Sequence, residues 1–531
     1  MTSIGEALVA GLAARGVDCI FGIPGVHTVE LYRGLAASGI RHVTPRHEQG
    51  AGFMADGYAR VSGRPGVAFV ITGPGVTNTL TAMGQARADS VPMLVVSGVN
   101  ARADLGRGIG HLHELPDQRA MMRTVALSSE RIEEAGQLSG ALDRAFAMMQ
   151  GARPGPVHIE VPLDVAGLAA QSLPSAGGPP ASAPVDAGQI AEAADRLSRS
   201  AAPVILVGGG ARGQRDLIRA LSERLDAPVV QTTNARGVMF GHPLGVPASP
   251  SLQAVRDLIA GADAVLAVGT EFGPTDYDMY STGTMTPMQG LIRIDICADQ
   301  LARHPAALSI HADAGPALEA LKDAISATNG KGGAARAEQA RRAAYDEIGP
   351  EMQALSDMLA AIRDAVPGSV MVGDSAQPIY AGNLYHDHDR PGGWFNAATG
   401  FGALGYAIPA AIGASIAAKD APVICIAGDG GAQFSLPELM CAVDEKLPIT
   451  FVIFNNHGYQ EIATSMQAVG VSVVGCDPTP PDFERVAQSC GMPFNRVGFE
   501  ADAVAGAIRS ARTAEGPTLV EVTTKNLSFP R

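Results

Sequence analysis

The chain has 531 residues, of which 39 are lysine or arginine and 53 are aspartate or glutamate, so its formal net charge is −14. A chain of this length corresponds to about three or four domains. The hydrophobic fraction of 46% excludes a disordered chain. Because the chain is acidic and its basic residues do not cluster, we expect no nucleic-acid partner.

The cysteines and the N-terminal residues indicate the compartment. None of the six cysteines has a metal-binding spacing, so we expect small core residues in a reducing environment. Residues 1–21 contain Glu6, Arg15 and Asp18, and they therefore lack the apolar core of a signal peptide. No stretch reaches the roughly 18 apolar residues that a membrane span needs. We therefore predict a cytoplasmic protein with no membrane partner.

Short apolar runs rich in β-branched residues alternate with helical stretches along the whole chain. The clearest runs are residues 66–71, 93–97, 203–207, 264–268, 423–427 and 449–454. Such runs separated by helices are typical of parallel sheets covered on both faces, which predicts an α/β fold. Two segments rich in proline, glycine and small residues, 172–184 and 326–337, divide the chain into three blocks. These blocks are residues 1–170, 185–325 and 345–531.

The first block contains a carboxylate at the junction of a predicted strand and helix. Glu48 follows the run 40–44 and is the third residue of the string 46–60 (RHEQGAGFMADGYAR). An acid at this place is commonly only a residue that interacts favourably with the helix dipole. A second glycine-rich string, residues 72–78 (TGPGVTN), follows the run 66–71.

The third block has the most specific pattern, in which two predicted strands each end in polar residues. Gly428-Asp429-Gly430 is separated by 24 residues (431–454) from Asn455-Asn456. Adjacent parallel strands lie about 4.8 Å apart, so Asp429 and Asn456 should emerge side by side. Carboxylate and amide oxygens suit Mg²⁺, and glycines let backbone N–H groups approach a diphosphate. Between them, residues 435–438 resemble a capping box that opens a helix ending near Lys446.

This pattern resembles the signature of the thiamine-diphosphate-dependent acetolactate synthase and 2-oxo acid decarboxylase superfamily. The resemblance implies three doubly wound parallel-sheet domains: pyrimidine-binding, central Rossmann-like and diphosphate-binding. It also implies thiamine diphosphate and Mg²⁺ as cofactors, with the metal held by Asp429, Asn456 and the carbonyl of Gly458. The residues implied to meet the diphosphate are Gly428, Gly430, Gly431, Asp374, Ser375, Ala376 and Gln377.

The first block resembles the part of the family that activates the cofactor. There the glutamate equivalent to Glu48 bonds to the aminopyrimidine and favours the imino tautomer, which takes the proton from C2. The resemblance further implies that Gly402 and Leu404 meet the two rings of the cofactor, and that Thr72 and Asn78 form a wall of the site. In this family the first domain of one subunit meets the third domain of another, which implies a homodimer or homotetramer.

Two positions bear on the type of reaction. Pro24-Gly25-Val26 occupies a loop in which some decarboxylases place an acid or serine, and the apolar Val26 cannot transfer protons. His113 stands where acetolactate synthases carry glutamine, and it is either a surface-loop residue or a group that moves protons near neutral pH. A proton-transferring His113 favours a decarboxylase. We take Glu48, His113 and Gly25 as the candidate catalytic residues.

Four positions bear on the substrate, which the family resemblance implies to be a 2-oxo acid. Glu461 stands where relatives line the pocket with apolar residues, so it is either solvated or paired with a cation. Asp276 and Asp278 lie in an acidic loop after the run 264–268, and Val26 completes the candidate substrate residues. Three strings look most like those of 5-guanidino-2-oxopentanoate (2-ketoarginine) decarboxylases, whose substrate has a cationic end. They are residues 24–34 (PGVHTVELYRG), 113–118 (HELPDQ) and 455–459 (NNHGY).

The alternative reading is a carboligase of the acetolactate synthase type, acting on pyruvate or a related 2-oxo acid. Such synthases commonly bind FAD in the middle domain. Here residues 208–211 are only a weak signal for a glycine-rich turn that binds a cofactor. Residues 242–245 are not followed by the string that those synthases carry at this place. We therefore expect no FAD.

Overall fold

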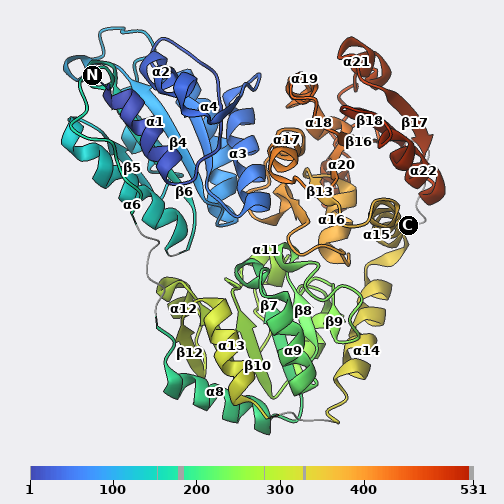
Figure 1. Ribbon diagram of the computed structural model, residues 1–531. Coiled ribbons are helices and arrows are strands. Elements are labelled where there is room, and N and C mark those ends of the chain that lie inside the picture. The colour runs from blue at the N-terminus through green and yellow to red at the C-terminus, as the bar shows by residue number, and fades with distance from the viewer. Residues whose placement is uncertain (1, 152, 178–183, 280–281, 327–329, 525–531) are drawn as a thin grey trace.

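The computed structural model describes residues 2–151, 153–177, 184–279, 282–326 and 330–524. It contains three six-stranded sheets, and every strand pair in them is parallel. In Figure 1 the first sheet (blue to cyan) and the third (orange to red) lie side by side, with the middle one (green to yellow) beneath both. This arrangement confirms the predicted α/β class with three domains.

The first sheet has the strand order β2-β1-β3-β4-β6-β5. Its strands are β1 (Cys19–Gly22), β2 (Arg41–Val43), β3 (Gly66–Val70), β4 (Met93–Val99), β5 (Ser128–Arg131) and β6 (Pro156–Pro162). The helices are α1 (Ile4–Ala14), α2 (Val29–Ser38), α3 (Glu48–Ser62), α4 (Pro74–Ala88), α5 (Gln118–Met122), α6 (Leu138–Gln150) and α7 (Leu163–Ala166). Phe21 and its neighbour Ile20 belong to cores on opposite sides of the sheet, so both faces are covered.

The middle sheet has the order β12-β11-β10-β7-β8-β9, which is the doubly wound order of dinucleotide-binding folds. Its strands are β7 (Pro203–Val207), β8 (Val229–Gln231), β9 (Gly245–Val246), β10 (Ala264–Val268), β11 (Ile292–Asp295) and β12 (Leu308–His311). The helices are α8 (Ala187–Arg199), α9 (Arg215–Leu225), α10 (Gln253–Ala260), α11 (Pro274–Tyr277), α12 (Ala298–Arg303) and α13 (Ala314–Ala324).

The third sheet has the order β14-β13-β15-β16-β18-β17. Its strands are β13 (Val370–Gly373), β14 (Trp394–Asn396), β15 (Val423–Gly428), β16 (Ile449–Asn455), β17 (Phe494–Gly498) and β18 (Thr518–Thr523). The helices that cover it are α15 (Gly349–Ala365), α16 (Gln377–Leu384), α17 (Ala407–Ala417), α18 (Asp429–Ala432), α19 (Leu439–Asp444), α20 (Gln460–Ala468), α21 (Phe483–Ser489) and α22 (Ala501–Ala511), whereas α14 (Gly333–Glu347) packs against the middle domain through Ala337, Ala340 and Ala344. Numbered within its own domain, this order is the same as that of the first sheet.

The two predicted breaks between the blocks are only partly described. Residues 178–183 of the first break and 327–329 of the second lie outside the described residues. The second break is shorter than predicted, because α14 already begins at Gly333. In the part of the chain that the structure describes, no helix is both long and apolar enough to cross a bilayer.

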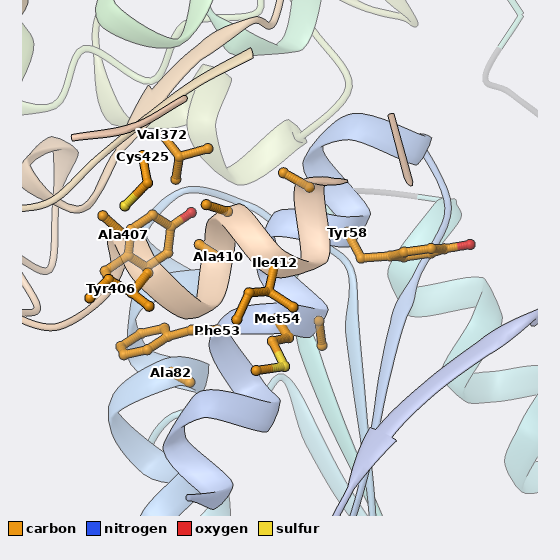
Figure 2. Packing of buried hydrophobic residues seen from close by; sticks show 14 of the residues in the cluster. Phe53, Met54, Tyr58, Ala82, Val372, Tyr406, Ala407, Ala410, Ile412 and Cys425 are labelled. Atoms are coloured by element: carbon orange, nitrogen blue, oxygen red, sulfur yellow. The ribbon is translucent and has the colours of Figure 1, made fainter. Parts of the chain in front are cut away.

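Helices α3 and α17 join the first and third domains, as Figure 2 shows, and their buried side chains form one continuous core. Each helix uses a glycine where the backbone of the other comes close. A Cβ on Gly57 would lie 2.0 Å from the carbonyl oxygen of Ala410, and one on Gly413 would lie 1.8 Å from that of Met54. Only residues without a side chain allow this separation, so the contact fixes the two domains relative to each other.

Candidate active site

A cavity of about 370 Å³ opens in the third domain, where β13, β15 and β16 end. Its lining combines apolar groups with a few polar ones, as ligand pockets usually do. The predicted residues that line it are Ser375, Ala376, Gln377, Gly402, Leu404, Gly428, Asp429, Gly430, Gly431, Asn456, Gly458 and Glu461. The structure therefore brings most of the predicted cofactor and metal positions together in one place.

Asp429 and Asn456 leave adjacent strands, as their spacing predicts, because Gly428 of β15 lies opposite Phe454 of β16. Asp429 is 1% exposed, and its Oδ1 accepts a hydrogen bond from the Asn456 backbone N–H at 3.4 Å. Burial raises the pKa of the Asp429 carboxyl. The other carboxylate oxygen and the Asn456 side-chain oxygen have no hydrogen-bond partner among the described residues.

Two buried oxygens without partners beside a cavity fit a cation as the missing partner. The residues present therefore suit the Mg²⁺ that the family resemblance implies, with Gly458 supplying a third oxygen from its carbonyl. In the described residues no group of three or more His, Cys, Asp and Glu side chains could hold a metal ion. A site of this kind would thus rely on only one carboxylate and on ligands from the bound cofactor.

The glycine-rich turn after β15 has no room for side chains. A Cβ on Gly430 would lie 2.5 Å from the Tyr459 ring, and one on Gly431 would lie 2.9 Å from Asp374 Oδ1. Across the cavity, Ser375 Oγ has no hydrogen-bond partner within the described part of the chain, and Gln377 accepts from the Asn456 amide at 3.2 Å. A turn of glycines beside a cavity, with a serine hydroxyl that lacks a partner opposite it, suits a diphosphate.

Asp374 has a different place from the one expected of a cofactor-binding residue. It is fully buried, and the described lining of the cavity does not include it. Its carboxylate accepts hydrogen bonds from the backbone N–H groups of Ser375, Gly405 and Ala407 at 2.9–3.2 Å. Burial raises its pKa to about 6. Asp374 thus holds the loop that carries Leu404 rather than facing a ligand.

Glu48 is the first residue of α3, as predicted, and Asn78 donates a hydrogen bond to it at 2.9 Å. The predicted wall residue Asn78 therefore orients the predicted activating acid. The described lining of the third-domain cavity does not include Glu48. Within one chain, the activating acid and the metal site are thus not brought together.

The segment before Glu48 is held by a residue that the sequence did not identify as functional. Glu438 was expected in a capping box, but Ser435 makes no side-chain capping bond and begins only a 3-10 turn (Leu436–Glu438). The Glu438 carboxylate, 1% exposed, instead accepts from the backbone N–H groups of Arg46 at 3.0 Å and His47 at 2.9 Å. Burial raises its pKa to about 7. The third domain therefore fixes the approach to Glu48.

His113 lies in the first domain beside a second histidine. Its ring centroid is 5.3 Å from that of His27, and its Nδ1 has no hydrogen-bond partner among the residues described. Burial and the nearby His113 lower the pKa of His27. Thr72 donates to the side chain of Gln118 at 2.8 Å and lies with His113 at the same polar cavity. His27 could have been noticed because it directly follows Pro24-Gly25-Val26.

Gly25 and Val26 lie in the same region of the first domain. A Cβ on Gly25 would lie 2.2 Å from the Ile71 side chain, so this turn packs closely against the residue after β3. Val26 is 64% exposed. Neither residue belongs to the described lining of the third-domain cavity.

The predicted substrate residues are not brought together, and this corrects the expectation for the acidic loop. Glu461 lines the cavity, whereas Asp276 and Asp278 lie in the middle domain and make local contacts. Asp276 is partly buried and accepts from the Thr233 backbone N–H at 3.2 Å. Asp278 accepts from the backbone N–H groups of Thr282 and Gly283 at 2.9 Å. Both carboxylates are thus used by nearby N–H groups.

Each of the three domains matches a known protein family. Three thiamine pyrophosphate enzyme models match the chain: the N-terminal TPP binding domain at residues 2–121, the central domain at 190–321 and the C-terminal TPP binding domain at 376–522.

Curated relatives match nearly the whole chain. It is 42% identical to the probable 2-ketoarginine decarboxylase AruI of Pseudomonas aeruginosa, over 98% of this chain and 93% of that protein. It is 27% identical to the acetolactate synthase isozyme 1 large subunit of Escherichia coli (97% and 93% covered). It is 29% identical to the acetolactate synthase large subunit of Corynebacterium glutamicum (96% and 84% covered). The chain therefore belongs to the family of thiamine pyrophosphate (thiamine diphosphate) enzymes.

Proposed function

We propose that the chain catalyses the non-oxidative decarboxylation of 5-guanidino-2-oxopentanoate to 4-guanidinobutanal and CO₂, with thiamine diphosphate and Mg²⁺. The observation that carries the substrate is Glu461, a partly buried carboxylate in the lining of the cavity. An acid in such a place favours a substrate with a cationic end. The identity of 42% to a probable 2-ketoarginine decarboxylase supports the same choice.

The third domain would bind the cofactor. Asp429, Asn456 and the Gly458 carbonyl would hold Mg²⁺ against the diphosphate, and the turn at Gly430 and Gly431 would supply backbone N–H groups. When bound, thiamine diphosphate supplies a carbanion that attacks the 2-oxo carbon and accepts the electrons released with CO₂.

The first domain would handle protons. Glu48, oriented by Asn78, would bond to the aminopyrimidine ring nitrogen and favour the imino tautomer, whose imino group takes up the C2 proton. His113, with His27 beside it, would deliver the proton that replaces CO₂ on the product carbon. These groups lie outside the described cavity lining. We therefore propose a homodimer or homotetramer in which a second copy brings Glu48 to the cavity.

The decisive assay measures CO₂ release from 2-oxo acids with cationic, neutral and aromatic side chains. We expect kcat/KM for 5-guanidino-2-oxopentanoate to exceed that for pyruvate by at least about 100-fold. Equal rates with pyruvate would contradict the substrate. Formation of acetolactate from pyruvate would instead support the carboligase alternative, which the acetolactate synthase relatives keep open. An absorbance spectrum of the purified protein tests our expectation that FAD is absent, and sedimentation tests the oligomer.

A further inference from the structure

A second carboxylate, Glu351, lies near Glu461, and the sequence gave no reason to connect the two. Glu351 is in the first turn of α15 and Glu461 in the first turn of α20. Leu355, one helical turn after Glu351 on the same face of α15, lines the cavity together with Glu461. Figure 1 shows α15 beside α16 in the third domain, and these two helices are in contact. Glu351 is outside the described lining itself, but its place one turn before Leu355 puts it next to the cavity wall that Leu355 and Glu461 form.

Neither carboxylate has a compensating partner within the described residues, since no hydrogen bond or ion pair to either of them is found there. Burial raises the pKa of both carboxyl groups, and the charge of Glu351 raises that of Glu461 further. No cationic side chain opposes these shifts. The phenol of Tyr380, which also lines the cavity, has its pKa raised by burial and by the charge of Glu461.

Two fully buried acids of this domain show the contrast, because backbone N–H groups satisfy them. Asp374 accepts from three backbone N–H groups, and Glu438 accepts from two. Two like charges that share a partly buried site without donors repel each other and lose hydration. Such an arrangement is stabilised when a cation from outside enters. The same cavity also holds the buried oxygens of Asp429 and Asn456 that lack partners, so it is independently a ligand site.

We propose that Glu351 and Glu461 together form the binding site for the guanidinium end of the substrate. This inference rests on the proposed function and adds the residue that completes substrate recognition. A guanidinium group presents five N–H donors in one plane, so it can donate to two carboxylates at once. An ammonium group is a more compact and more strongly hydrated charge, and it would use the pair less well. The site should therefore select arginine-derived over lysine-derived 2-oxo acids.

The test compares Glu351→Gln and Glu461→Gln on two matched substrates. One is 5-guanidino-2-oxopentanoate, and the other is the neutral 5-ureido-2-oxopentanoate of the same length. For each variant we expect kcat/KM for the guanidino acid to fall about 10- to 100-fold, mainly through KM, because one charge-assisted interaction is lost. The ureido acid should change by less than about 3-fold. Glu338→Gln, which removes an exposed carboxylate on α14, is the matched control.

A binding test separates this inference from the proposed reaction. In the holoenzyme, 4-guanidinobutanoate should raise the unfolding temperature more than 4-ureidobutanoate does, and Glu351→Gln should abolish the difference. Without ligand, Glu351→Gln should unfold at the same or a higher temperature, since a repulsion is removed.

Each outcome has a distinct meaning. If the wild type releases no CO₂ from the guanidino acid but still binds 4-guanidinobutanoate selectively, the proposed reaction fails and the site stands. If Glu351→Gln lowers kcat/KM equally for the guanidino and ureido acids, or lowers it for neither, the proposed role of Glu351 is overturned. Stabilisation by Mg²⁺ alone that disappears in Glu351→Gln would also overturn it, because the pair would then be a metal site.

Discussion

The first and third domains share one scaffold and use it for different chemistry. Their strand orders, β2-β1-β3-β4-β6-β5 and β14-β13-β15-β16-β18-β17, are identical when counted within each domain. The loops that follow equivalent strands also correspond. The third strand ends near Thr72-Gly73-Pro74 in the first domain and at Gly428-Asp429-Gly430 in the third domain. The residue directly after the fourth strand is Asn100 in the first domain and Asn456 in the third domain. The helices α3 and α17, which pack together, occupy the same place in each domain.

The difference lies in the loop that follows the third strand, which carries a carboxylate only in the third domain. In the third domain, one oxygen of Asp429 and the side-chain oxygen of Asn456 have no partner among the described residues, and both residues line the cavity. In the first domain, Asn100 donates to the Leu112 carbonyl at 3.2 Å and its own side-chain oxygen also lacks a partner there, but the acid is Glu48, at the start of α3, which accepts from Asn78. If the proposed roles hold, the same strand order carries the proposed cation and diphosphate site in the third domain and the proposed proton-transferring residues in the first domain. The predictions below test this division.

Replacing Asp429, the acid of the proposed metal site, should have the largest effect. Asp429→Ala removes the one carboxylate of the proposed metal site, so we expect the affinity for thiamine diphosphate with Mg²⁺ to fall at least about 100-fold. Titration calorimetry measures this directly. Asn100→Ala, at the first-domain position that corresponds to Asn456, is the control and should change the affinity by less than about 3-fold. An equal loss of cofactor affinity in both variants would contradict the assignment of cofactor binding to the third domain.

Replacing Glu48 in the first domain should leave cofactor binding nearly unchanged and should slow the activation of the cofactor. In Glu48→Gln we expect the exchange of the cofactor C2 proton to slow by about 100-fold or more, because a carboxyl group that shifts protons is lost. The affinity for the cofactor should stay within about 3-fold of the wild type, because glutamine can still form a hydrogen bond to the aminopyrimidine and the proposed diphosphate site in the third domain is unchanged. Exchange is followed by NMR after acid quench, with Glu133→Gln, an exposed acid of the same domain, as the control. Unchanged exchange would refute the role of Glu48.

The fold class and the adjacency of Asp429 and Asn456 could be predicted because the information is local. The run before Gly428 makes a buried strand, the next run makes its neighbour, and parallel pairing then puts Asp429 beside Asn456 whatever the rest of the chain does. Glu48 at the start of α3 follows from the same reasoning. These residues are fixed by strand ends and helix starts, which the sequence pattern predicts directly.

The contacts that the sequence could not predict join distant segments. Glu438 stands three residues after Ser435, so a local cap was expected, yet its donors are the N–H groups of Arg46 and His47, nearly 400 residues away in the chain. Asp276 and Asp278 do follow a strand end, but of the middle sheet, where nearby N–H groups satisfy them. Nothing in the sequence tells which of three similar sheet edges a loop will face.

The helix contact between the two domains offers a smaller effect on stability. Gly57→Ala and Gly413→Ala each place a methyl group against the backbone of the partner helix, and we expect each to lower the free energy of unfolding by about 1–3 kcal/mol. Gly506→Ala in α22 meets nothing within 4 Å and should raise it by about 0.4–1 kcal/mol. Chemical denaturation measures all three. Equal effects in the three variants would show that the close approach of α3 and α17 is unimportant.

The smallest expected effect concerns Glu438, which ties the third domain to the approach of Glu48. Its pKa is raised by burial from 4.5 to about 7, so between these values the folded protein binds more protons than the unfolded chain. This group therefore favours folding at low pH, and its contribution is lost as the pH rises from about 4.5 to 7. In Glu438→Gln, which cannot titrate, this part of the pH dependence should disappear from denaturation curves recorded across that range.

The same variant distinguishes a positioning role for Glu438 from a purely structural one. The glutamine oxygen can still accept from the N–H groups of Arg46 and His47, but without a charge, so the segment before Glu48 should be held less firmly. We expect C2 proton exchange to slow only about 3- to 10-fold, with cofactor affinity unchanged. Glu445→Gln, which removes the exposed partner of Arg41 nearby, should leave exchange unaffected. If Glu438→Gln alters stability across the pH range but not exchange, Glu438 joins the two domains without positioning the activating acid.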